Sequence, residues 1–193
     1  RSRRQRQMCI RDSNFTVGTP DFKPDESVMK VVSEAALDPE NYKYSLGDTD
    51  ELLDAVCKWY KRRYNTVITP DEVASVFGTQ EGMAHIALAL CNPGDLCLVP
   101  NPGYPIFEIG PFLCDAQIAY YNLLPENDYL IDFDSIDEDT AKKAKMMVVS
   151  YPLNPVCATA PDEFYDKLIA FAKKYNIIII HDNAYSCLLY TSD

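Results

Sequence analysis

The chain has 193 residues, 47% of them hydrophobic and 24% charged, a composition typical of a globular protein with a sizeable apolar core. It carries 18 Lys and Arg against 29 Asp and Glu, a net charge of −11, which excludes a nucleic-acid binder that relies on clustered cations. No run approaches the roughly 18 apolar residues of a membrane-spanning helix. The high hydrophobicity, with only 7 glycines, also excludes collagen-like and disordered classes.

The two ends of the chain differ from the rest. Five of the 18 basic residues lie within residues 1–13, a pattern similar to a targeting peptide. A second interpretation fits better, because a DNA that encodes residues 187–193 can encode residues 7–12 (Gln-Met-Cys-Ile-Arg-Asp) on its opposite strand. Such a match is typical of a sequencing adaptor translated at both ends of a DNA fragment. We therefore expect 1–13 and 187–193 to be adaptor-derived tails, and 14–186 to be an internal piece of a longer protein.

Between these tails, the residue types that bind metals lack the spacing of a metal site. The cysteines are odd in number and scattered, at Cys57, Cys91, Cys97, Cys114 and Cys157. They predict free thiols in a reducing compartment, and therefore a cytoplasmic protein. His85 and His181 have no carboxylate or cysteine at ligand spacing, so we expect no metal site. His85 is predicted to be a core residue on an apolar helix face.

Residues 14–48 are irregular apart from a short helix predicted at 26–36, and prolines interrupt them. From Asp50 to Tyr60 apolar residues recur at three- and four-residue steps, which predicts an amphipathic helix. Further along, the chain alternates between strand-like apolar runs and helical segments. The predicted strands are 73–77, 96–99, 118–122, 146–150 and 177–181, with an extended stretch at 131–135 before an acidic turn. The predicted helices are 82–90, 104–113 and 161–175.

Two of the predicted strands contain runs that are apolar on both faces. These runs are Met146–Val149 and Ile177–Ile180. A strand of this kind suits a parallel sheet that is covered by helices on each side. The predicted fold class is therefore α/β, with three layers and a mainly parallel sheet.

Turn-rich polar clusters follow four of the predicted strands. They are residues 78–82 (Gly-Thr-Gln-Glu-Gly), 100–105 (Pro-Asn-Pro-Gly-Tyr-Pro), 151–155 (Tyr-Pro-Leu-Asn-Pro) and 181–185 (His-Asp-Asn-Ala-Tyr). Ligands of open α/β sheets bind beyond the carboxyl ends of the strands. A purely structural sheet edge would not need these polar side chains, so we expect a binding site there.

Each cluster also has a structural interpretation. Residues 78–82 would cradle a phosphate at a helix N-terminus, or form an ordinary tight turn. Asp182, which follows four isoleucines, needs a cationic or donating partner, or else caps a helix. Tyr104 is compatible with packing, and Asn154 with a turn. The clusters are more informative together than singly.

Taken in this order, the four clusters resemble those of fold-type I pyridoxal-phosphate enzymes, the class I/II aminotransferases. The similarity covers nearly all of 14–186 and is greatest to the branch that contains the LL-diaminopimelate and aspartate aminotransferases. It implies that 14–48 are an N-terminal arm or part of the small domain. It also implies that 49–186 are the amino half of the large, pyridoxal-phosphate-binding domain. The whole protein would be a homodimer that acts on a small amino acid and a 2-oxo acid, with no membrane or nucleic-acid partner.

The resemblance implies how pyridoxal phosphate would be held at its phosphate and its ring face. Thr79 and Gln80 are similar to the residues that cradle the cofactor phosphate. Tyr104 is similar to the aromatic residue that stacks on the pyridine ring. Tyr44, or alternatively Tyr42, resembles a tyrosine that reaches the phosphate of the neighbouring subunit.

The resemblance also implies partners for the polar atoms of the cofactor ring. Asn154 and Tyr185 are similar to the two donors to the ring hydroxyl oxygen. Asp182 is similar to the carboxylate that pairs with the ring nitrogen. An ionised carboxylate there keeps the nitrogen protonated, so that the ring can accept electrons from the substrate.

The chain departs from the family pattern in two places. Residues 155–157 are Pro-Val-Cys, where the family commonly has Pro-Thr-Gly. No lysine follows Asp182, although the Schiff-base lysine of the family lies downstream of this segment, as does the arginine that binds the substrate carboxylate. We therefore expect the parent protein to be a transaminase and this chain to be inactive. Alternatives are a carbon–sulfur β-lyase or decarboxylase on the same fold, or a non-catalytic, aminotransferase-like regulator domain.

Overall fold

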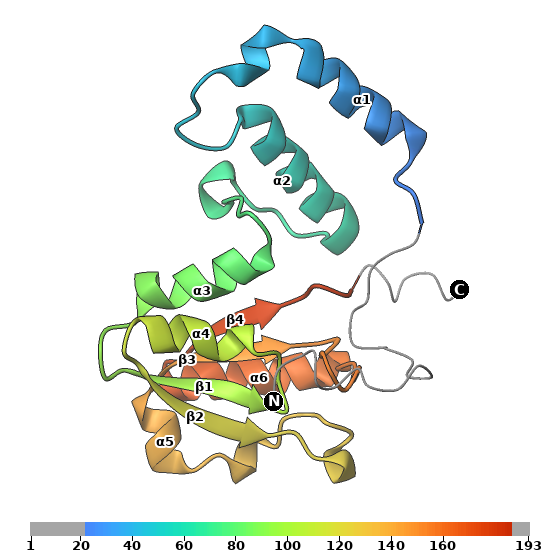
Figure 1. The fold of residues 1–193 in the computed structure, drawn as a ribbon. Helices are drawn as coiled ribbons and strands as arrows, with labels where there is room; N and C mark the ends of the chain where they lie inside the picture. The colour runs from blue at the N-terminus through green and yellow to red at the C-terminus, as the bar shows by residue number, and fades with distance from the viewer. Residues whose placement is uncertain (1–21, 187–193) are drawn as a thin grey trace, which may run out of the picture. The chain divides into compact units, whose positions relative to one another are not determined.

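The computed structural model of the protein describes residues 22–186. The predicted adaptor-derived tails, 1–13 and 187–193, lie outside the described residues (Figure 1). The chain divides into two compact units, one ending at Pro70 and the other beginning at Asp71. The predicted boundary between residues 48 and 49 concerns the domains of the whole protein and stays a prediction. Within residues 22–186, no helix combines the length and apolarity needed to cross a membrane.

The first unit is helical, as the periodicity of its apolar residues predicts. Asp25 caps the first helix by accepting a hydrogen bond from the backbone N–H of Ser27, and Thr49 caps the last one in the same way. Asn65, in the left-handed conformation with φ of 51°, ends that last helix. The elements are α1 (Glu26–Leu37), the 3₁₀ turn η2 (Pro39–Tyr42) and α2 (Asp50–Tyr64).

The second unit contains a four-stranded, fully parallel sheet with strand order β2-β1-β3-β4. This arrangement confirms the predicted α/β fold class. The strands are β1 (Leu96–Asn101), β2 (Gln117–Asn122), β3 (Ala144–Ser150) and β4 (Ile178–Asp182). Each lies within two residues of a predicted strand. In the sheet, β1 has β2 on one side and β3 on the other. The strand order therefore reverses between β1 and β3.

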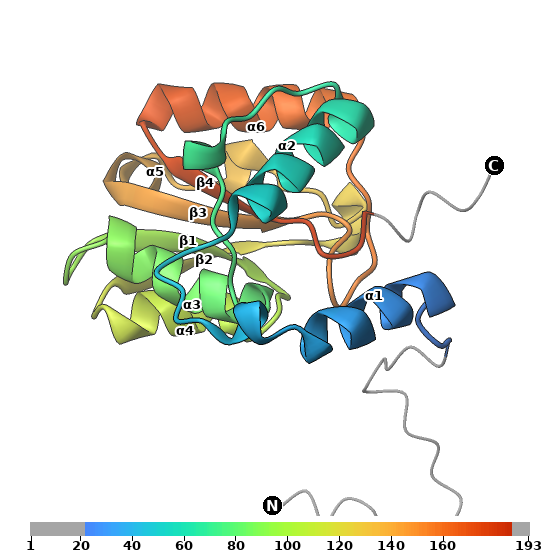
Figure 2. The same cartoon turned by 90° about the horizontal axis from the view of Figure 1, so that it is seen from above.

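Helices cover both faces of the sheet and complete the three predicted layers. α3 and α4 lie on one face, whereas α5 and α6 lie on the other (Figure 2). Gly110 brings α4 close to α3, because a Cβ atom at this position would lie 2.6 Å from the carbonyl oxygen of Met83. The helices of this unit are α3 (Thr79–Leu90), α4 (Ile106–Leu113), α5 (Glu138–Lys143) and α6 (Asp162–Tyr175).

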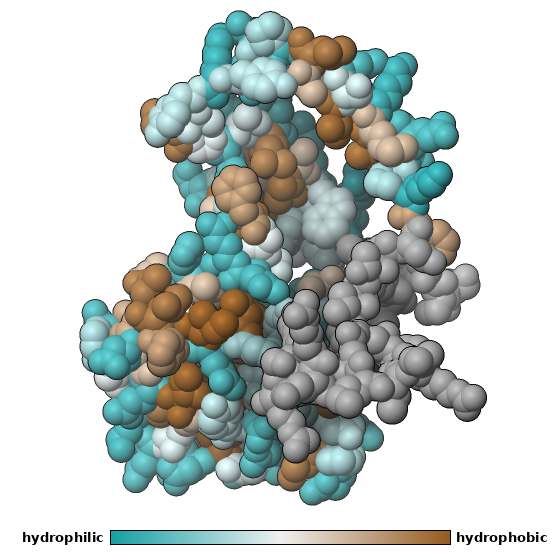
Figure 3. Space-filling view, viewed as in Figure 1, coloured by the Kyte–Doolittle hydropathy of each residue, from teal (hydrophilic) through white to brown (hydrophobic). Residues whose placement is uncertain are grey.

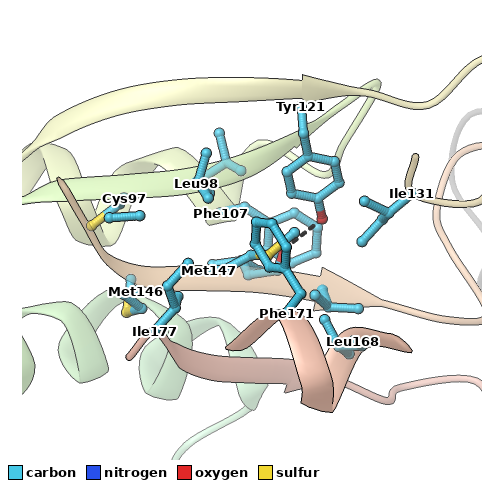
Figure 4. Packing of buried hydrophobic residues seen from close by; sticks show 14 of the residues in the cluster. Cys97, Leu98, Phe107, Tyr121, Ile131, Met146, Met147, Leu168, Phe171 and Ile177 are labelled. Carbon is cyan, nitrogen blue, oxygen red and sulfur yellow. Dashed lines mark hydrogen bonds between the residues drawn. The ribbon is translucent and has the colours of Figure 1, made fainter. Parts of the chain in front are cut away.

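The core of the second unit lies around the two central strands (Figure 4). Cys97, Leu98 and Val99 of β1 are at most 1% exposed, and the apolar run of β3 is buried on both faces as predicted. Exposed apolar side chains gather at the surface over α3 and α4 (Figure 3). These exposed side chains are Leu88, Ile109, Phe112 and Leu113. Such a patch is typical of a surface that another protein segment covers.

Two of the predicted strands differ from the structure. Residues 73–77 form no strand, and Phe77 is fully exposed. A strand needs a neighbour for its backbone hydrogen bonds, and within residues 22–186 only the strands β1, β2, β3 and β4 pair with one another. The second run, in β4, is not covered on both faces: β4 is an edge strand, and Ile178 is 39% exposed.

The segment before β3 also differs from its prediction. The stretch predicted as extended ends in a 3₁₀ turn, η5 (Phe133–Ser135), because the side chain of Asp132 accepts a hydrogen bond from the N–H of Asp134. The predicted acidic turn is the short helix α5, which Asp137 caps through the N–H of Thr140. Two further 3₁₀ turns are η3 (Pro70–Glu72) and η4 (Pro125–Asn127).

Candidate functional site

The polar clusters that follow the strands lie at the carboxyl edge of the parallel sheet. The strand order reverses between β1 and β3, which is where open α/β sheets bind ligands. Residues 102–105 leave the end of β1, and residues 151–155 leave the end of β3. On the other side of β3, Ser150 pairs in register with Asp182, the last residue of β4. The topology therefore brings three of the four clusters to one edge.

The fourth cluster forms the N-terminus of α3. Gly78 has a φ of +87°, a conformation that favours glycine, and no side chain caps the helix there. Glu81 turns back, and its carboxylate accepts a hydrogen bond of 2.6 Å from the N–H of Phe77. The N–H groups of Thr79 and Gln80 in the first helical turn are left facing outward, a geometry suited to an anion. The predicted helix at 82–90 thus begins three residues earlier, at Thr79.

Tyr104 is held in place by its immediate neighbours. A Cβ atom on Gly103 would lie 2.6 Å from the carbonyl oxygen of Pro100, so only glycine allows this close turn after β1. The Tyr104 ring packs edge-on to Phe107, with 6.2 Å between ring centroids. Its hydroxyl accepts a hydrogen bond of 2.7 Å from Nε2 of Gln80. The structure therefore brings the α3 cluster and the β1 cluster together.

Asn154 and Tyr185, which are 31 residues apart in sequence, also come together. Nδ2 of Asn154 donates a hydrogen bond of 3.4 Å to the hydroxyl of Tyr185. The turn that carries Asn154 is closed by a backbone hydrogen bond of 2.6 Å from the N–H of Cys157 to the carbonyl of Leu153. Cys157 has a φ of 58°, so a side chain occupies a left-handed position where the family pattern has glycine. The turn forms despite this departure.

Asp182 lies half-buried at the tip of β4. Burial raises the pKa of its carboxyl group, and the adjacent His181 opposes this only in part. Within the described residues, no lysine or arginine contributes to its electrostatic surroundings. A half-buried carboxylate in this position would be stabilised by a cationic N–H donor from a ligand.

The two remaining predictions on single residues have different outcomes. Tyr44 and Tyr42 belong to the first unit, so their place relative to the sheet edge stays a prediction. The prediction that His85 is a core residue is wrong: its side chain is 63% exposed, with Nδ1 3.8 Å from a carboxylate oxygen of Glu81. The buried face of α3 is formed by Met83 and Ala87, and a residue midway between them points to the opposite side.

Sequence reasoning missed the contacts that fix these side chains. The close approach at Gly103 and the hydrogen bond between Gln80 and Tyr104 were not anticipated. A signal did exist for Glu81, because a glutamate three residues after the N-cap is the spacing of a capping box. The other two contacts depend on the path of the chain after β1.

Comparison with known proteins shows what this fold and site define. The family model "Aminotransferase class I and II" matches residues 11–193, so the chain belongs to the class I and II aminotransferase family. Membership of this family implies pyridoxal phosphate as the cofactor. The acceptors and donors of amino groups in such enzymes are small amino and keto acids.

Several relatives carry one particular name. The chain is 43% identical over 175 residues to the LL-diaminopimelate aminotransferase of Halothermothrix orenii, covering 90% of this chain and 45% of that protein. It is 44% identical over 172 residues to the enzyme of the same name from Aquifex aeolicus, covering 88% of this chain and 44% of that protein. The chain thus spans less than half the length of these curated relatives.

Solved structures agree with the fold. Substrate-bound BacF from Bacillus subtilis is 40% identical with a TM-score of 0.82, over 86% of this chain and 42% of that one. A probable N-succinyldiaminopimelate aminotransferase from Thermus thermophilus is 32% identical with a TM-score of 0.81, over 86% and 45% of the two chains. The α/β architecture is therefore the one found in aminotransferases.

Proposed function

We propose that this chain is the amino half of a pyridoxal-phosphate-dependent aminotransferase, which moves an amino group between an L-amino acid and a 2-oxo acid. The observation that carries the proposal is the convergence at the carboxyl edge of the sheet. At this edge, Gln80 in the first turn of α3 contacts Tyr104, which follows β1. Asp182 is the last residue of β4 at the same edge. Family membership supports the reaction class.

The residues present fit the cofactor at its charged groups. The uncapped first turn of α3, with Thr79 and Gln80, would hold the phosphate, because its outward N–H groups and the helix dipole favour an anion. Asp182 would pair with the protonated ring nitrogen, which would supply the cationic donor that its half-buried carboxylate lacks. When bound, pyridoxal phosphate supplies an electron sink for the negative charge that develops on the substrate.

The remaining site residues would orient the ring. Tyr104 would stack on the pyridine face, since its ring is already fixed by Phe107 and Gln80. Asn154 and Tyr185, joined by a hydrogen bond, would both donate to the ring hydroxyl oxygen. In a homodimer, Tyr44 or Tyr42 would reach the phosphate of the neighbouring subunit. The exposed apolar side chains over α3 and α4 are a surface that a dimer could cover.

We also propose the cellular location, the partners and the first substrates to assay for the whole protein. We place it in the cytoplasm, because its cysteines at described positions are free thiols. We propose no membrane or nucleic-acid partner, in keeping with a net charge of −11. Diaminopimelate is the first amino donor to assay in the full-length enzyme, followed by aspartate and alanine, because relatives are named LL-diaminopimelate aminotransferase.

The proposal is tested by non-covalent cofactor binding. The chain has no lysine after Asp182, so we expect no transaminase turnover from it. Pyridoxamine phosphate needs no lysine, and its fluorescence should change saturably when it is titrated with the 193-residue chain. Pyridoxamine, which lacks the phosphate, should bind more weakly, because it cannot use the N-terminus of α3. Equal binding of the two compounds would contradict the proposed phosphate site, and turnover by the purified chain would contradict the expected inactivity.

A further inference from the structure

Gln80 and Tyr104 are linked directly through their side chains. Nε2 of Gln80 donates a hydrogen bond of 2.7 Å to the hydroxyl of Tyr104, across 24 residues of sequence. This distance is at the short end of the range for an N–H donor to an oxygen. The Gln80 amide nitrogen is therefore fixed at the phenol hydroxyl. The bond to Tyr104 uses one of the two N–H donors of this amide nitrogen, and the carbonyl oxygen of the side chain can only accept.

The link completes a set of contacts that fix the Tyr104 ring. The backbone before it is set by Gly103, which has no room for a side chain against Pro100. The edge of the ring is set by Phe107. The hydroxyl at the far end of the side chain is bound by Gln80, which lies in the first turn of α3. The ring and the outward N–H groups of that turn are thus held in one frame.

We propose that Gln80 is a positioning residue, whose side chain orients Tyr104 for stacking on the cofactor ring instead of binding the cofactor phosphate. This inference rests on the proposed function, because it takes Tyr104 to be the stacking residue. It changes the role expected from the sequence, in which Gln80 was part of the phosphate cradle. The backbone N–H of Gln80 keeps that role, and only the side chain is reassigned.

The test is a double-mutant cycle on binding of pyridoxamine phosphate and pyridoxamine to the 193-residue chain. Gln80→Leu should weaken the binding of both compounds by about fivefold, as expected for the net loss of one hydrogen bond that pre-orders the ring. In a Tyr104→Phe background the same change should have an effect of less than about twofold, because the bond is already lost. The near-ultraviolet circular dichroism of bound pyridoxamine phosphate should diminish in both single variants.

Two further variants keep the test decisive. Gln80→Asn retains the amide but is too short to reach Tyr104, so it should behave like Gln80→Leu. Gln117→Leu is the matched control, since Gln117 is exposed at the amino end of β2, and it should leave binding and dichroism unchanged. A urea titration of each variant shows whether it is folded.

The possible results separate the inference from the proposed function. A loss in Gln80→Leu that is confined to pyridoxamine phosphate, and that persists in the Tyr104→Phe background, would show direct phosphate binding by the side chain and overturn the inference alone. Absence of saturable binding by the unaltered chain would overturn the proposed site and this inference with it. Equal losses for both compounds, absent without the Tyr104 hydroxyl, would support the positioning role.

Discussion

Tyr121 ties an edge strand to the centre of the sheet. It lies in β2 and is 4% exposed, and its hydroxyl donates a hydrogen bond of 2.6 Å to the backbone carbonyl of Val148 in β3 (Figure 4). β1 lies between these two strands, so the bond spans the point where the strand order reverses. Burial raises the pKa of Tyr121 well above its usual value, which keeps the hydroxyl protonated as a donor.

Tyr121→Phe removes this hydroxyl and little else. The change should lower the free energy of unfolding by about 1–2 kcal/mol, because a buried hydrogen bond is lost and the carbonyl of Val148 loses a partner. With a slope of about 2 kcal/mol per molar urea, the midpoint should fall by about 0.5–1 M. The assay is urea unfolding followed by circular dichroism, with the slope unchanged.

Tyr120→Phe is the matched control for this prediction. Tyr120 is the preceding residue of the same strand, but it is 53% exposed. Its replacement should change the free energy of unfolding by less than about 0.5 kcal/mol. Equal effects of the two substitutions, or an unaltered midpoint in Tyr121→Phe, would refute the tie between β2 and β3.

Three further predictions concern the turn, the thiols and the site carboxylate. Cys157→Gly should stabilise the chain by about 0.5–1 kcal/mol in urea unfolding, because the left-handed conformation costs a side chain about 1–2 kcal/mol and the extra freedom of unfolded glycine offsets part of it; a lower stability would contradict this. In iodoacetamide labelling at pH 8, mapped by mass spectrometry, Cys157 should react well before Cys97, because Cys157 is exposed whereas burial raises the pKa of Cys97 to about 12. Faster reaction of Cys97 would show that β1 is not buried. Asp182→Asn should raise the free energy of unfolding at pH 7, and the gain should vanish at or below about pH 3.8. A carboxyl group whose pKa is raised by folding destabilises the native state only once it ionises. A gain that persists at that low pH would contradict the assigned cause.

The central strands could be predicted from the sequence because their residues are mostly apolar. The run in β3 is apolar on both faces and is buried as it predicts, whereas the similar run in β4 lies at the edge of the sheet. Residues 73–77 are also mostly apolar but form no strand, because strand formation also depends on a partner. His85 shows a related limit: its helix is apolar overall, and only the packed arrangement reveals which side is buried.

The location of the site could be predicted better than its contacts. Parallel strands put their carboxyl ends at one edge, so the clusters around Tyr104 and Asp182 could be assigned to that edge from their order alone. The hydrogen bond from Gln80 to Tyr104 could not, because it joins side chains from a helix and a loop whose relative position depends on the packing of α3. The fit of Gly103 against Pro100 depends in the same way on the backbone path.

A crystal structure of the chain with pyridoxamine phosphate tests the central claim most directly. The account predicts a single bound molecule, with its phosphate at the N–H groups of Thr79 and Gln80, its ring on Tyr104 and its ring nitrogen at the carboxylate of Asp182. A molecule bound away from the carboxyl edge of the sheet, or one whose ring nitrogen faces a residue other than Asp182, would contradict it.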